Sequence, residues 1–118
     1  MRKIIPTITL CLSIGQSHAL QTDDLMSKCS QPEGSMSEGI CIGYISGVSD
    51  TIDSAGNRNY CPGIPYDIDL MKRVVMTYID RTRHIDAQSE TPPATQRQFA
   101  SVPVKAALLE AFPCKANQ

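Results

Sequence analysis

The segment from Cys41 to Asp50 constrains the fold of this chain more than any other part of the sequence. It combines a cysteine with apolar residues at helical spacing. Glycines at intervals of four lie on one stripe of the same predicted helix: Gly39, Gly43 and Gly47. Each costs about 1 kcal/mol in a helix interior, so three together indicate close backbone packing. We expect the stripe, with Tyr44 in the core and its hydroxyl hydrogen-bonded, to pack inside the chain; a homodimer interface is the alternative.

The first nineteen residues have the organisation of a secretory signal peptide. Residues 1–3 are basic at positions 2 and 3, an apolar run covers residues 4–15, and Ala19 ends a small-residue cleavage site. The run is shorter than the roughly 20 residues of a membrane span, and no later stretch comes close. Lipid attachment at Cys11 is the alternative, which the preceding leucine disfavours. We therefore predict cleavage after Ala19 and a single exported domain over residues 20–118, without membrane insertion.

The charge balance argues against a nucleic-acid partner. The full chain has a formal net charge of −1, and removal of Arg2 and Lys3 leaves nine basic and twelve acidic residues, a net charge of −3. No basic patch is interleaved with aromatic residues. Because the chain has no tryptophan and few aromatic residues, we expect a mostly aliphatic core.

The predicted domain contains four cysteines, which we interpret as two structural disulfides: Cys29, Cys41, Cys61 and Cys114. No C-x-x-C spacing exists, so neither a metal site nor a thiol redox centre is predicted. If four helices alternate in direction, the first two cysteines lie at one end of the bundle and the last two at the other. Cysteine Cα atoms must lie within about 7 Å to pair, so the order predicts Cys29–Cys41 and Cys61–Cys114.

Periodicity and capping residues predict an all-α fold, a small disulfide-stapled bundle of about four helices. The first expected helix covers about residues 22–29, with Thr22 as its cap, and the second runs from a cap at Ser35 or Ser37 to about residue 52. The third runs from a cap at Asp67 to residues 81–84, and the fourth covers about residues 101–112. The inward residues of the second helix are predicted as Cys41, Tyr44, Ile45, Val48 and Ile52. Those of the third are Ile68, Met71, Val75, Tyr78 and Ile79. Those of the fourth are Val102, Ala106, Leu109 and Phe112, with Leu108 beside them.

No catalytic constellation is evident. The predicted domain has one histidine, His84, in a setting typical of a helix end. Asp50 and Asp53 form a carboxylate pair at i, i+3, which at a helix end is more often solvated than catalytic. We therefore expect no enzyme activity, no metal and no cofactor, and we predict a binding function.

The polar stretch from Ile85 to Arg97 is the longest predicted loop and the best place for a functional protrusion, although a plain connector is the simpler interpretation. Partner-binding residues are predicted there: Glu90, Thr91, Pro92, Pro93 and Gln96. The loop from Ser54 to Tyr60 is the second candidate.

Four motifs carry a resemblance to a known family. They are Cys41-x-Gly43-Tyr44-Ile45-x-Gly47-x-x-Asp50, Cys61-Pro62, Val74-Val75-x-x-Tyr78-Ile79 and Ala107-Leu108-x-x-Ala111-Phe112-Pro113-Cys114. From about Cys29 to Cys114 the chain resembles the Rap/Tai family of periplasmic immunity proteins of Gram-negative bacteria. The resemblance implies a helical, non-catalytic protein of the periplasm, often a homodimer. It also implies a partner, a peptidoglycan-cleaving amidase delivered by type VI secretion, whose active site the protein blocks.

The chain departs from the family pattern at two places. The stretch from Ile85 to Thr95 is longer than in typical members, and Pro103 stands where the pattern has an uninterrupted helix. No motif carries the toxin-contacting residues, so the resemblance transfers no interface. A periplasmic stress chaperone and a structural envelope protein are the alternative functions. Suppression of aggregation at low pH, absent at neutral pH, would favour the chaperone.

Overall fold

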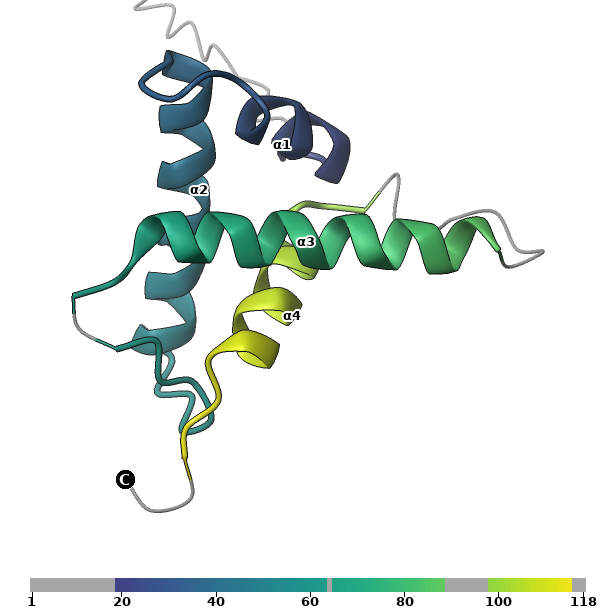
Figure 1. Ribbon diagram of the computed structural model, residues 1–118. Helices are drawn as coiled ribbons and strands as arrows, with labels where there is room; N and C mark the ends of the chain where they lie inside the picture. Colours follow the sequence, from purple (N-terminus) through teal and green to yellow (C-terminus); the bar gives the residue numbers. More distant parts are fainter. Residues whose placement is uncertain (1–18, 64, 89–97, 116–118) are drawn as a thin grey trace, which may run out of the picture.

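The computed structural model describes residues 19–63, 65–88 and 98–115, which form four helices (Figure 1). They are α1 (Thr22–Cys29), α2 (Met36–Ser54), α3 (Ile68–Ala87) and α4 (Ser101–Ala111). α4 has its largest contact with α3, and α1 with α2. The described residues contain isolated β-bridges but no strand. The prediction of a small all-α bundle is confirmed. No helix in this part of the chain has the length and apolarity needed to cross a membrane.

Side chains at the helix starts confirm two predicted caps and correct a third. The Ser35 hydroxyl accepts the Glu38 N–H at 3.2 Å, and the Asp67 carboxylate accepts the Leu70 N–H at 2.9 Å. Thr22 does not cap α1, because it lies one residue inside the helix. Its buried hydroxyl donates instead to the Gln98 carbonyl at 2.9 Å. This contact ties the start of α1 to the segment that leads into α4.

The predicted inner faces of α2 and α3 are largely correct. Both helices bury residues at regular helical spacing, and their half-buried neighbours pack against the same core. The buried apolar residues of α2 are Cys41, Ile45 and Ile52, with Tyr44 and Val48 half-buried. Those of α3 are Met71, Val75 and Ile79, with Ile68 and Tyr78 half-buried. α3 continues to Ala87, so the first residues of the predicted loop at 85–97 are helical.

The predicted inner face of α4 is only partly correct: Leu108 is buried, and Leu109 and Phe112 pack against the core, but the most buried stripe of the helix is a different one. The helix turns Val104, Ala107 and Leu108 into the core, whereas Val102 is 49% exposed. The other two predicted residues within the helix are only half-buried. α4 is apolar around most of its circumference, so two stripes compete for the core and periodicity does not distinguish them.

The two disulfides pair the cysteines as the helix order predicted. Cys29 and Cys41 have Cα atoms 5.1 Å apart, and Cys61 and Cys114 have Cα atoms 4.9 Å apart. The first pair is buried and joins the end of α1 to α2. The second pair joins the chain after α2 to the end of α4, and Cys61 is exposed.

The glycine stripe of α2 does not pack inside the molecule, which corrects the prediction of internal packing. A Cβ atom added at Gly39, Gly43 or Gly47 would meet no heavy atom within 4 Å, the helix's own nearby backbone aside. The buried residues of α2 lie on a different face, and Asp50 is also exposed. The stripe is therefore an open surface of the single chain.

Candidate functional site

The predicted partner-binding residues Glu90, Thr91, Pro92, Pro93 and Gln96 lie outside the described residues. The structure describes the flanks of this segment. On one side, α3 ends with Ile85 62% exposed. On the other, the Ala100 N–H donates to the Leu20 carbonyl at 2.9 Å, which fixes the chain before α4.

The second candidate segment, Ser54 to Tyr60, is a surface loop with a buried anchor. Tyr60 is 4% exposed, and its hydroxyl is hydrogen-bonded to the Ser49 hydroxyl at 2.6 Å. Removal from water raises the pKa of the Tyr60 phenol, which stays protonated at neutral pH. The exposed residues Arg58 and Asn59 precede this anchor. The loop thus presents a polar tip from a fixed base.

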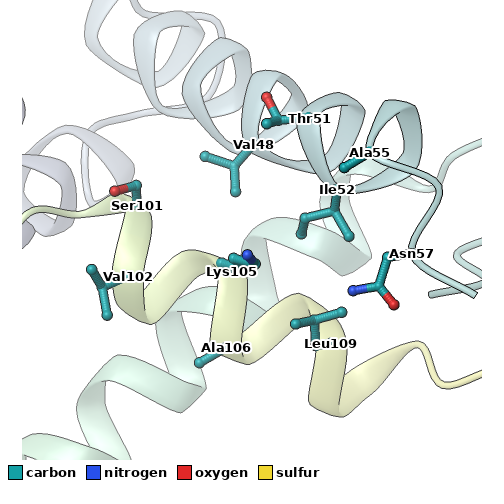
Figure 2. A pocket seen from close by; sticks show the side chains of 10 residues that line it. All are labelled: Val48, Thr51, Ile52, Ala55, Asn57, Ser101, Val102, Lys105, Ala106 and Leu109. Atoms are coloured by element: carbon teal, nitrogen blue, oxygen red, sulfur yellow. The ribbon is translucent and has the colours of Figure 1, made fainter. Parts of the chain in front are cut away.

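An apolar groove of about 520 Å³ lies between α2 and α4 (Figure 2). Its lining residues come from α2, the turn after it, and α4: Val48, Thr51, Ile52, Ala55, Asn57, Ser101, Val102, Lys105, Ala106 and Leu109. The α4 wall is the stripe that the sequence placed in the core. Asn57 brings the second candidate segment to the edge of this groove.

The polar groups of the groove are few, and two already have partners. The Thr51 hydroxyl donates to the Gly47 carbonyl at 2.8 Å, and the Asn57 side-chain oxygen accepts the Asn59 N–H at 3.0 Å. Lys105 is exposed and is the charged residue of the lining. It forms no ion pair with any described residue. The groove is thus an apolar strip with one available cation.

A second, more polar groove of about 290 Å³ lies between α3 and α4, on the other side of α4. Arg81 lines it and pairs with Glu110 at 2.7 Å, and its guanidinium lies 5.3 Å from the centre of the Tyr78 ring. The hydrogen bond and charge of Glu110 raise the pKa of Arg81. Because Arg81 is already paired, Arg73 is the cation of this groove without an ion pair among the described residues.

Glu38 carries a nearly buried carboxylate that joins α2, α3 and the preceding turn. It is 5% exposed, pairs with Lys72 of α3 and accepts the Gly34 N–H at 2.5 Å. The hydrogen bond from Lys72, then that from Gly34, lowers the pKa of Glu38. Sequence periodicity did not reveal this role, although the Ser35-x-x-Glu38 spacing is that of a capping box.

The residues considered for catalysis are not assembled into a site. His84 is exposed and lies 3.8 Å from Asp80 of its own helix. The Asp53 carboxylate accepts a hydrogen bond from the exposed Tyr66 hydroxyl at 3.3 Å. Within the described residues, no group of three or more His, Cys, Asp or Glu side chains could hold a metal ion.

Comparison with known proteins identifies the family. Neither a curated protein nor a solved structure matches the chain. A family model described as Rap1a immunity proteins matches residues 21–114, which include all four helices and both disulfides. The match extends over most of the sequence, so this chain belongs to the Rap1a family of immunity proteins.

Proposed function

We propose that this protein is a periplasmic immunity protein that binds and inhibits a peptidoglycan amidase delivered by type VI secretion. Membership of the Rap1a immunity family carries the general function, protection against a secreted effector by binding it. The resemblance of the Cys41 to Asp50 and Ala107 to Cys114 motifs to the Rap/Tai family supports the amidase as the target.

Two features support action outside the cytoplasm. The first nineteen residues have the organisation of a cleavable signal peptide. The four cysteines of the predicted domain pair in two disulfides, which persist in oxidising compartments such as the periplasm. An amidase that attacks the cell wall acts in the same compartment.

The inhibitory mechanism we propose is occlusion of the effector's active site rather than chemistry. In the described part of the chain the cysteines are oxidised and His84 is on the surface, which leaves these residues without an activated nucleophile. Glu90, Thr91, Pro92, Pro93 and Gln96 remain our proposed plug, because in the sequence they follow the end of α3, where Ile85 is 62% exposed.

A homodimer through the open face of α2 is a second proposal. Gly43 and Gly47 allow a second helix to approach closely, as small residues do at helix interfaces. Met36 and Ile40 on the same helix are 86% and 44% exposed, so association would remove apolar surface from water.

The test starts with oxidised protein of residues 20–118 as bait in periplasmic extract, and mass spectrometry identifies what it retains. The purified candidate amidase is then assayed on peptidoglycan with and without the immunity protein. Stoichiometric inhibition supports the proposal. Retention of many unfolded proteins, without inhibition of any cell-wall enzyme, would instead support the chaperone alternative.

Deletion of Glu90 to Thr95 tests the location of the plug. We expect the deletion to abolish binding of the amidase while the melting temperature stays nearly unchanged. Unaltered affinity would exclude this placement but not the immunity function.

A further inference from the structure

The two walls of the α2–α4 groove have matching periodicity. Val48 and Ile52 on α2 and Ala55 in the turn after it are spaced i, i+4, i+7, and Ile52, which is 3% exposed, forms the floor of the groove. Val102, Ala106 and Leu109 on α4 have the same spacing. Figure 2 shows α2 and α4 running in the same direction, with Val48 and Ile52 pointing toward α4, Leu109 on the side of α4 nearer α2, and Val102 and Ala106 along the outer edge of α4. Each row spans about 10 Å, or two helical turns.

We propose that this groove binds an amphipathic helix of the secreted effector, with the helix's apolar stripe between the two rows and an acidic side chain paired with Lys105. The inference rests on the proposed function, because the effector is the partner. A short helix laid between two helices is an established mode of recognition, in which residues at i, i+4 and i+7 are the anchors. The volume of about 520 Å³ suits a few apolar side chains rather than a whole domain.

The charge of the groove specifies the occupant further. An ammonium group that loses water without a partner is costly, so an apolar helix alone would bury Lys105 unfavourably. Lys105 has no ion pair with a described residue, and the Glu110 carboxylate is already paired with Arg81 at 2.7 Å. A carboxylate on the incoming helix would complete the site and fix its orientation.

The first experiment measures the Kd between the amidase recovered above and four forms of this chain, the wild type and three single variants. Val102→Asp and Lys105→Glu change the groove, and both residues are exposed, so we expect their folds to persist. Arg73→Glu is the matched control, because it places the same charge on the α3–α4 side. We expect each groove variant to bind at least tenfold more weakly and the control to bind like wild type, within about twofold. Equal affinities for all four proteins would overturn the inference and leave the immunity function intact.

The second experiment examines the groove without the amidase, so it still decides if the proposed function fails. ¹⁵N-labelled protein is titrated with a stapled helical peptide that carries leucines at i, i+4, i+7 and one central glutamate. We expect shifts in the amide signals of Val48, Val102 and Ala106, and weaker binding by a peptide with lysine in place of glutamate. Shifts elsewhere, no shifts, or equal binding of both peptides would overturn the proposal. Shifts of these signals with protein concentration alone would also overturn it, in favour of a second copy.

Discussion

The hydroxyl oxygens of Ser49 and Tyr60 lie 2.6 Å apart, and both residues are buried. This contact fixes the loop after α2 against the C-terminal half of that helix. The Cys61 N–H, one residue further, donates to the Phe112 carbonyl at 2.9 Å, so the same loop also holds the end of α4.

We expect Tyr60→Phe to destabilise the protein by about 1–3 kcal/mol, because it leaves the buried Ser49 hydroxyl without its partner. Ser49→Ala should destabilise it for the same reason, because it leaves the buried Tyr60 hydroxyl without its partner. The double variant should cost less than the sum of the two, since no unpaired hydroxyl remains. Urea unfolding at neutral pH measures all three. Additive losses would mean that the two hydroxyls do not depend on each other.

Gly43→Ala should stabilise the isolated chain by about 1 kcal/mol. The helix's own nearby backbone aside, the new methyl group meets no atom within 4 Å, and alanine is the better helix former. Gly56→Ala is the matched control, and it should destabilise because Gly56 has a φ of 68°. Thermal unfolding under monomeric conditions distinguishes the two. A loss of stability in Gly43→Ala would instead support the hypothesis that the glycine stripe packs inside the chain.

The oligomeric use of the same stripe is tested by Gly43→Leu. If the open face of α2 forms a homodimer, a bulky side chain at Gly43 should prevent it while the fold persists. Sedimentation velocity should then show a wild-type dimer and a monomeric variant. A wild-type monomer at high concentration would contradict the homodimer.

The inner faces of α2 and α3 were predictable because each helix has one clearly apolar face. The disulfide pairing was predictable from the order of the cysteines along the helices. The alternating helix directions assumed for it were not correct for α3, which lies across α2 (Figure 1). The face of α4 that turns inward was not predictable, because Val102 and Val104 are equally apolar and only their packing in the structure distinguishes them. Glycines in a helix interior carry a free-energy cost, but assigning the stripe to an internal contact was wrong, because its three positions are open. The groove combines two stripes from distant helices, so no local pattern predicts it.

Acid should weaken the attachment of α2 to α3. The hydrogen bond from Lys72 holds the pKa of Glu38 in the folded state below its ordinary value of 4.5. The carboxylate therefore contributes stability that is complete above about pH 4.5 and is lost as the pH falls through the folded-state pKa. We expect Glu38→Gln to unfold at lower urea than wild type at pH 7, and the difference to shrink toward pH 3. Glu33→Gln, on the exposed turn before α2, is the control and should show little difference at either pH. A constant difference for Glu38→Gln would contradict the assignment.

Of two adjacent leucines on α4, one lies in the core and the other on the groove wall. Leu108 is fully buried, so Leu108→Ala should destabilise the protein by about 2–5 kcal/mol through lost contacts and a cavity. Leu109 is half-buried on the groove wall, so Leu109→Ala should cost less, about 1 kcal/mol. Because the two changes remove the same atoms from the same helix, the difference in urea midpoint reports burial alone. Binding of the helical peptide should show the reverse order at a temperature where both variants are folded, with the larger loss for Leu109→Ala. A larger stability loss for Leu109→Ala would instead support the orientation of α4 that the sequence predicted, in which the groove does not exist.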